Sequence, residues 1–213
     1  MTRVKVCGIT RLEDAHLAAD AGAWAIGMIF VPDTPRVIEI GAAREIGRAL
    51  QRRLEVTGVF VNAAIDEVVA VADACALTMV QLHGDEGPAY CREVARRAGT
   101  KVMKAVRAKD ATAVRHLSSY REVDLHLLDS YVDGRLGGTG ETFPWELARH
   151  HVGAVPFVLS GGLNPDNVGE AITQVHPFAV DTASGTEASP GVKDPAKVTA
   201  FFRSVEHASQ RAA

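Results

Sequence analysis

Four short segments of this sequence combine an apolar run with a side chain that could do chemistry. Cys7 closes the run RVKVC, and Asp129 closes EVDLHLLD. Arg36 follows two prolines in IFVPDTPR, while Gln81 and His83 lie in VQLHGDE. A thiol with a lowered pKa can act as a base, and an aspartate desolvated among leucines favours its protonated form and suits a general acid. These residue types indicate proton transfer on a small molecule.

Each of these residues also has an ordinary structural interpretation. Cys7 could be an inert buried residue, Asp129 a loop cap and Arg36 a solvated surface arginine. Cys7 lies at the end of a strand and is followed by a glycine, and both features favour a chemical role for Cys7. The prolines stiffen the loop around Arg36, whose guanidinium suits a carboxylate or a phosphate. His83 fits a hydrogen-bonded lining residue better than a metal ligand, because no partner stands at ligand spacing.

Two later segments, 155–165 (VPFVLSGGLNP) and 176–187 (HPFAVDTASGTE), are apolar runs that end in glycine and hydroxyl residues. Small residues let a phosphate approach backbone N–H groups closely. The candidate phosphate-binding residues are Gly161, Gly162, Ser184 and Gly185. In a (β/α)8 barrel the loops after the last two strands are the usual phosphate site. The segment 137–143 (GGTGETF) lacks the Lys-Ser/Thr of a P-loop, so we expect a mobile cover over the site.

Short β-branched runs alternate with amphipathic helical patterns along the whole chain. The expected strands are 3–7, 24–30, 55–61, 77–82, 101–106, 123–129, 155–160 and 177–182. The expected helices are 11–21, 40–51, 64–75, 86–98, 143–151, 165–174 and 194–207. The pattern at 109–119 is weak and fits an irregular connection as well as a helix. Eight strands with alternating helices predict a closed, parallel eight-stranded (β/α)8 barrel, with an open doubly wound sheet as the alternative.

Length and composition agree with an ordinary enzyme domain. The chain has 213 residues, 47% of them hydrophobic, and a formal net charge of −3. We expect one domain over 1–213, no nucleic-acid partner and no membrane span. Three cysteines without CxxC spacing favour a reducing, cytoplasmic location. An anionic substrate would be held by local donors, because the chain offers no broad positive field.

The first strand raises a second question, which concerns Lys5. Side chains alternate along a strand, so Lys5 and Cys7 share one face. If that face is the barrel interior, the ammonium of Lys5 needs an acidic partner, because a lone buried charge is very costly. Asp181 and Asp129, on other strands, are the two candidates.

Nine segments together resemble the phosphoribosylanthranilate isomerase family. They are VKVCGIT, the loop ending in Pro35-Arg36, GVFVN, QLHGDE, LLDS, GGTGETFPW, LSGGLNPDNV, VDTASG and PGVKD. They occur in order, at family-like spacing, from the first strand to about residue 194. The resemblance implies a TIM barrel that carries out an Amadori rearrangement of N-(5′-phosphoribosyl)anthranilate to 1-(2-carboxyphenylamino)-1-deoxyribulose 5-phosphate in tryptophan biosynthesis.

The resemblance also implies roles for single residues. Cys7 matches the general base and Asp129 the general acid, while Arg36 matches the residue expected to hold the anthranilate carboxylate. It implies no metal or organic cofactor and a phosphorylated small-molecule substrate, with either a monomer or a homodimer as the assembly. Two positions depart from the family pattern: Ala183 removes a hydroxyl near the expected phosphate, and Met28 stands where the family often has an aromatic or another apolar residue.

Two other functions stay open at this stage. The related aminoaldose isomerase of histidine biosynthesis is a barrel enzyme with aspartate at the end of its first strand. This chain has Cys7 there, which argues against that function. A non-catalytic phosphosugar-binding protein would need neither Cys7 nor Asp129. A metal-dependent epimerase is a further barrel alternative, but this sequence lacks the pairs of histidines that such an enzyme uses. An isomerisation assay separates these functions.

Overall fold

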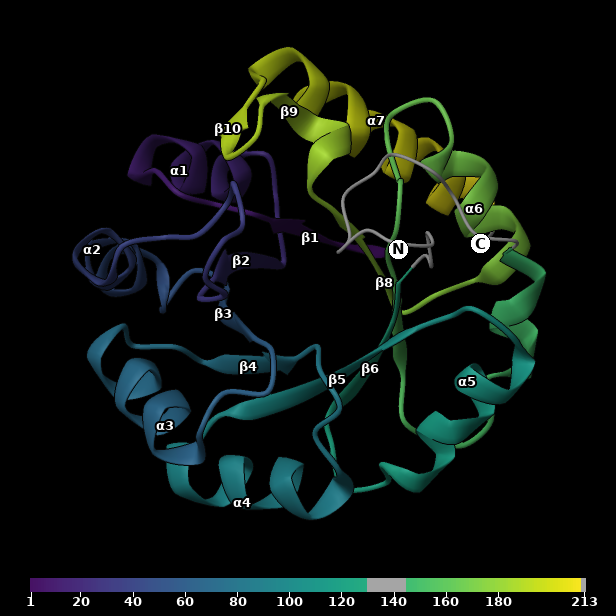
Figure 1. Cartoon of the computed structure of the whole chain (residues 1–213). Coiled ribbons are helices and arrows are strands. Elements are labelled where there is room, and N and C mark those ends of the chain that lie inside the picture. Colours follow the sequence, from purple (N-terminus) through teal and green to yellow (C-terminus); the bar gives the residue numbers. More distant parts are fainter. Residues whose placement is uncertain (130–144, 212–213) are drawn as a thin grey trace.

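Eight parallel strands form a closed barrel at the centre of the molecule (Figure 1). The computed structural model describes residues 1–129 and 145–211. Strands pair in chain order, and β1 closes the ring against β8. The strands are β1 (Arg3–Cys7), β2 (Ala25–Ile29), β3 (Glu55–Phe60), β4 (Met79–Leu82), β5 (Lys101–Arg107), β6 (Leu125–Asp129), β7 (Phe157–Leu159) and β8 (Ala179–Thr182). The (β/α)8 barrel is therefore confirmed, and an open sheet is excluded.

Helices surround the barrel and cover its outer face (Figure 1). The α-helices are α1 (Leu12–Asp20), α2 (Ile40–Leu50), α3 (Ile65–Ala74), α4 (Pro88–Ala98), α5 (Ala111–His116), α6 (Val168–Val175) and α7 (Pro195–Arg211). The short 3₁₀ helices are η1 (Leu117–Ser119), η2 (Trp145–His150) and η3 (Ser184–Thr186). A small antiparallel pair, β9 (Glu187–Ser189) and β10 (Val192–Lys193), follows β8.

The structure settles one segment that the sequence left open and differs from the expected pattern in two helices. The weak segment 109–119 folds as the short helix α5 followed by η1. The helix expected over 143–151 is the 3₁₀ helix η2, because only a few residues separate Trp145 from Gly153, whose φ is +116°. Helix α6 starts after 165, since Asn164 Oδ1 accepts from the backbone N–H of Asn167 and forms a turn first. The expected cover at 137–143 lies outside the described residues.

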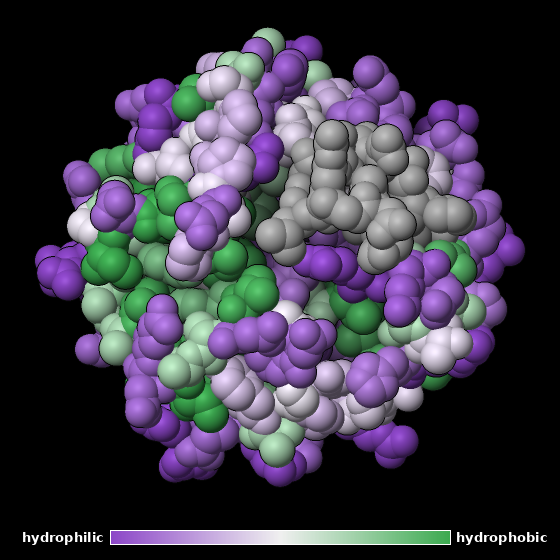
Figure 2. Space-filling view, in the orientation of Figure 1, coloured by the Kyte–Doolittle hydropathy of each residue, from purple (hydrophilic) through white to green (hydrophobic). Residues whose placement is uncertain are grey.

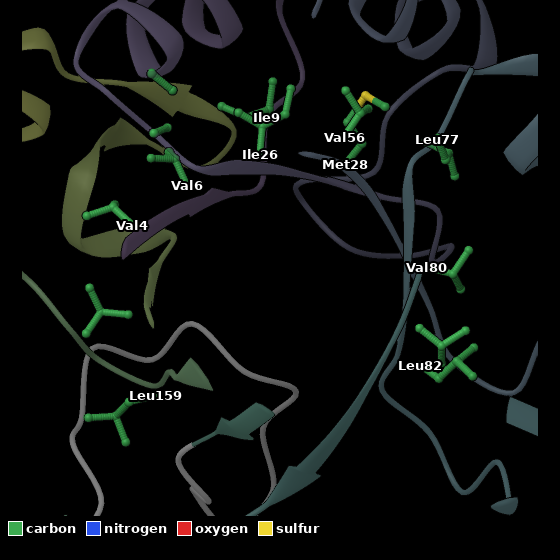
Figure 3. Close-up of a cluster of buried hydrophobic side chains, with 14 of the residues drawn as sticks. Val4, Val6, Ile9, Ile26, Met28, Val56, Leu77, Val80, Leu82 and Leu159 are labelled. Atoms are coloured by element: carbon green, nitrogen blue, oxygen red, sulfur yellow. The ribbon is translucent and has the colours of Figure 1, made fainter. Parts of the chain in front are cut away.

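Alternation along each strand sorts its side chains into two apolar layers. Val4 and Val6 of β1 and Val80 of β4 belong to the outer layer between the strands and the helices, part of which Figure 3 shows. Met79 and Met103 belong to a smaller cluster that fills the inside of the barrel. Burial of each such side chain contributes about 1.5–3 kcal/mol. Polar residues at inward positions near the carboxyl ends of the strands are therefore the ones placed to meet a ligand.

Candidate active site

Cys7 ends β1 and lies at the wall of a pocket at the carboxyl end of the barrel. Gly27 is its neighbour on β2, and a Cβ there would lie 2.7 Å from Cys7 Sγ and 3.1 Å from Lys5 Nζ. The next residue, Gly8, has a φ of +75°, and a Cβ there would lie 2.8 Å from Cδ of Arg36. The two glycines leave room for the thiol and for the arginine beside it.

Lys5 is fully buried inside the barrel, and its acidic partner is Asp181. Lys5 Nζ donates to Asp181 Oδ1 at 2.9 Å, and the two residues are register partners on β1 and β8. Ser160 Oγ donates to the other oxygen, Oδ2, at 3.1 Å. The expectation that Lys5 needs a carboxylate is thus confirmed, and of its two candidates Asp181 supplies the ion pair.

The charges around Cys7 act on its thiol in opposite directions. Burial raises the pKa of Cys7, whereas the ammonium groups of Lys5 and Lys193 lower it, and burial prevails. The thiol therefore keeps its proton at neutral pH in the resting site, and the thiolate is the minor form. The lowered pKa that would favour Cys7 as a base is not found in the pocket before substrate enters.

Asp129 ends β6, on the opposite side of the barrel from Cys7, and its carboxyl is also buried. His83 Nε2 lies 3.3 Å from Asp129 Oδ2. Although the two groups are close, Nε2 forms no hydrogen bond among the described residues. Gln81 Nε2 lies 3.1 Å from the other ring nitrogen, Nδ1. In the tautomer with its proton on Nε2, the His83 ring accepts from the NH2 group of Gln81 at Nδ1 and turns its own N–H toward Asp129.

Arg36 reaches the pocket from the loop after β2, and Glu187 holds it in place. Its Nε and Nη2 donate to the Glu187 carboxylate at 2.8 and 2.7 Å. Lys193 Nζ lies 3.2 Å from the same carboxylate and donates to the backbone oxygens of Cys7 and Ala183 at 2.7 and 2.9 Å. Burial raises the pKa of Glu187, but hydrogen bonds from Arg36 and the charge of Lys193 outweigh it and leave that pKa lowered. Arg36 is thus a fixed, charged donor.

The loops after β7 and β8 supply backbone in unusual conformations at the same pocket. Gly161 and Gly162 have φ values of +93° and +65°, which suit glycine. Ser184 starts η3, whose first N–H groups have no acceptor within that helix. A Cβ on Gly185 would lie 2.1 Å from the carbonyl oxygen of Leu163, so this glycine allows the two loops to pack together.

One pocket gathers almost all of the residues that the sequence singles out. Its lining includes Cys7, Arg36, Gln81, His83, Asp129, Gly161, Gly162 and Ser184. Gly185 lies behind this lining, against the loop after β7. Figure 2 shows hydrophobic residues beside the hollow at the middle of the face it presents. Within the described residues, no three His, Cys, Asp or Glu side chains cluster in a way that could hold a metal.

Sequence reasoning missed several polar residues of this site. Glu187 and Lys193 lie on β9 and β10, a pair that no strand pattern predicted. Arg107, at the end of β5, also lines the pocket. The signal that could have found Glu187 and Lys193 is their chemistry: a carboxylate and a lysine close to a glycine-rich strand end need partners when buried.

Comparison with known proteins decides the family. Residues 4–204 match the family model of N-(5′-phosphoribosyl)anthranilate (PRA) isomerase. The N-(5′-phosphoribosyl)anthranilate isomerase of Citrifermentans bemidjiense is 50% identical over 198 residues, covering 93% of this chain and 94% of the relative. The chain belongs to the PRA isomerase family.

Two solved structures of PRA isomerases resemble the barrel closely. One contains monomers of the dimeric enzyme from Thermotoga maritima; it is 39% identical, with a TM-score of 0.85, over 97% of this chain and 100% of that one. The other is a complex with reduced 1-(o-carboxyphenylamino)-1-deoxyribulose 5-phosphate; it is also 39% identical, with a TM-score of 0.84 and the same coverage.

The family membership fixes the reaction. The enzyme isomerises N-(5′-phosphoribosyl)anthranilate in tryptophan biosynthesis, which excludes a binding protein without turnover. In the part of the chain that the structure describes, no helix is both long and apolar enough to cross a membrane.

Proposed function

We propose that Cys7 is the general base and Asp129 the general acid of this isomerisation. The observation that carries the proposal is their placement: each ends a strand, each is buried, and they line one pocket from opposite sides of the barrel. A sugar held between them presents its ring oxygen to one residue and C2′ to the other. A positioned acid or base is worth about 10² to 10⁴ in rate.

The proposed reaction starts with ring opening. The carboxyl proton of Asp129 goes to the ring oxygen, the bond from C1′ to that oxygen breaks, and the nitrogen lone pair forms the C1′=N bond. The thiolate of Cys7 then takes the proton from C2′, which moves the double bond to C1′=C2′ and gives the enolamine. Tautomerisation protonates C1′ and leaves the ketone at C2′. These steps move only protons and electron pairs within the substrate, so we propose that no cofactor takes part.

The two anionic ends of the substrate are assigned to opposite parts of the rim. We place the phosphate against backbone N–H groups of Gly162, Ser184 and Gly185, as is usual for loops after the last two strands of a barrel. We place the anthranilate carboxylate on Arg36, whose orientation is set by Glu187. Gln81 and His83 would contact the substrate between these ends, since both line the pocket.

The remaining proposals concern the cellular location, the assembly and the type of substrate of the enzyme. It acts in the cytoplasm, as a monomer or a homodimer, on a small phosphorylated substrate. The Thermotoga maritima relative is described as dimeric. Sedimentation of the pure protein decides between the two assemblies.

The test of the proposed roles is turnover by the pure enzyme and by Asp129→Asn. The amide keeps the shape of the side chain but has no proton to transfer, so kcat should fall by about 10² or more with the fold intact. Asp124→Asn is the control, because Asp124 comes just before β6, far from the pocket end, and accepts a hydrogen bond from the backbone N–H of Val102. Full activity of Asp129→Asn would assign the acid to another group, with His83 the first to test.

A further inference from the structure

Lys5 is one of the largest completely buried side chains among the described residues, and the proposed acid and base steps give it no task. Burying an ammonium is expensive, and the ion pair with Asp181 offsets only part of that cost. Ile, Leu or Met would fill an inward position of a barrel strand without any such cost. The position therefore calls for an explanation beyond packing.

The surroundings of Lys5 place its ammonium beside the thiol. Cys7 Sγ and Lys5 Nζ both lie about 3 Å from the point that a Cβ on Gly27 would occupy, at 2.7 and 3.1 Å. Lys5 donates a hydrogen bond to Asp181 and interacts electrostatically with Cys7. Ser160 donates to the second oxygen of Asp181. These contacts link four residues from the end of β7, from β8 and from β1: Ser160, Asp181, Lys5 and Cys7. We call this chain of contacts the thiol network.

The protonation state of Lys5 limits what it can do. Burial lowers the pKa of Lys5, but the charge of Asp181, joined by that of Cys7 when the thiol is ionised, outweighs burial, and that pKa is raised. Lys5 therefore stays positively charged and cannot itself accept a proton. It can only donate hydrogen bonds and stabilise a neighbouring negative charge.

The formal charges close to Cys7 favour such a negative charge. Three cations lie near it, namely Lys5, Lys193 and Arg36, and each has an electrostatic interaction with the thiol. Two carboxylates pair with them, Asp181 with Lys5 and Glu187 with the other two. These three positive and two negative groups together have a net formal charge of +1. A thiolate at Cys7 would complete the balance.

We propose that Lys5, oriented by Asp181 and Ser160, is a positioning residue that stabilises the thiolate of Cys7 and so makes this cysteine an effective base. The inference rests on the proposed role of Cys7, and it assigns the thiol network to that role. Lys5 does not touch the substrate; it acts on the sulfur through the positive charge of its ammonium.

The test is the pH dependence of Cys7 alkylation in the absence of substrate, measured with neutral iodoacetamide and followed on the peptide that contains Cys7. Lys5→Met should move the alkylation curve to higher pH by about one unit or more, because an opposite charge at contact distance shifts a pKa by that much. At a fixed pH below the midpoint, alkylation becomes at least about tenfold slower. Lys5→Arg keeps the charge and should restore part of the effect.

A second variant keeps the test decisive if Lys5→Met does not fold. Lys5→Met/Asp181→Leu removes both partners of the ion pair, a change that is often tolerated. It keeps the surplus positive charge near Cys7, but the ammonium that it removes acts on the thiol more strongly than the carboxylate does. This variant too should therefore alkylate more slowly. Lys104→Met is the matched control, since Lys104 is buried on the outer face against Glu86. The buried Cys75 and Cys91 report on folding within each sample.

The outcomes separate the two proposals. Wild-type alkylation curves in folded Lys5→Met and in the double variant would overturn the role of Lys5. Activity of Cys7→Ala would overturn the role of Cys7 as base, whatever the alkylation shows. A shifted curve in both Lys5 variants, with an unshifted one in Lys104→Met, supports the thiol network.

Discussion

Lys5 and Lys104 are buried on opposite faces of the same barrel, and each pairs with a carboxylate. Lys5 Nζ lies 2.9 Å from Asp181 inside the barrel, while Lys104 Nζ lies 2.7 Å from Glu86 in the outer layer. Their remaining donors differ. Lys104 donates to the backbone oxygen of Gly84 at 2.6 Å, whereas the ammonium of Lys5 interacts electrostatically with Cys7.

The difference shows that a buried ion pair does not by itself mark a functional site. Around Lys104, Glu86 also accepts hydrogen bonds from the backbone N–H groups of Asn62 and Gly84. This cluster therefore fixes the loops after β3 and β4. Around Lys5, the second partner is Cys7, a group that can gain and lose a proton. What the lysine touches besides its carboxylate separates a structural role from a chemical one.

The largest effect expected from this contrast is that of Cys7→Ala. Its kcat should fall by at least about 10², with KM little changed, because proton abstraction occurs only in the transition state. Cys91→Ala is the matched control, since Cys91 is buried in the outer layer and the Lys104 charge acts on it. Steady-state assays of the two variants measure this difference. An equal loss of kcat in both would show that Cys7 has no role in catalysis that Cys91 lacks.

Lys104→Met should affect stability and leave the chemistry intact. Removing one partner of a buried ion pair costs about 3–5 kcal/mol of unfolding free energy. Lys101→Met, which breaks a half-exposed pair with Glu55, should cost about 1 kcal/mol or less. Denaturant titration measures both. A folded Lys104→Met enzyme with a pH–rate profile unlike the wild type would give the outer cluster a part in catalysis.

A second polar group of the outer layer, the pair of His126 and His151, predicts acid sensitivity. Burial lowers the pKa of His126 from 6.5 to about 4. His126 Nδ1 lies 2.8 Å from His151 Nε2, and its Nε2 lies 3.0 Å from the carbonyl oxygen of Tyr120. Between those pH values the unfolded chain binds a proton that the folded one does not. Stability is therefore complete above pH 6.5 and falls by about 3 kcal/mol on the way to pH 4.

Unfolding titrations across this pH range check the histidine prediction. His126→Phe removes the titrating group and should flatten the dependence of stability on pH. His207→Gln, at an exposed position, should leave the dependence as it is in the wild type. An unchanged slope in His126→Phe would show that other groups govern the response to acid.

The smallest effect is expected at the rim, for Arg36. Arg36→Met should raise KM by about 10- to 100-fold, since a charge-assisted hydrogen bond contributes about 1.5–3 kcal/mol. Arg36→Lys should restore binding only in part, because it keeps the charge but not the fork. Arg53→Met, which breaks an exposed pair with Asp20, should leave KM unchanged. An unaltered KM in Arg36→Met would move the anthranilate carboxylate away from this loop.

The sequence pattern was sufficient for the barrel, because strand and helix periodicities alternate along the chain. It also placed Cys7 and Asp129 at strand ends, and such ends meet at one mouth in a parallel barrel. The contact between Arg36 and Glu187 could not be foreseen in this way. It joins residues 151 positions apart and depends on how β1 and β8 close the ring and where the chain turns after β8. The balance of charges around the thiol likewise exists only after closure.

The most direct test of the division of labour between Asp129 and Cys7 uses a substrate without a ring to open. The imine of anthranilate with 4-deoxyribose 5-phosphate cannot close, because it lacks the hydroxyl that forms the furanose. Asp129→Asn should isomerise this analogue at close to the wild-type rate, whereas Cys7→Ala should stay impaired by about 10² or more. Normal turnover of the analogue by Cys7→Ala, or an equal defect of Asp129→Asn on both substrates, would contradict the assignment of acid and base.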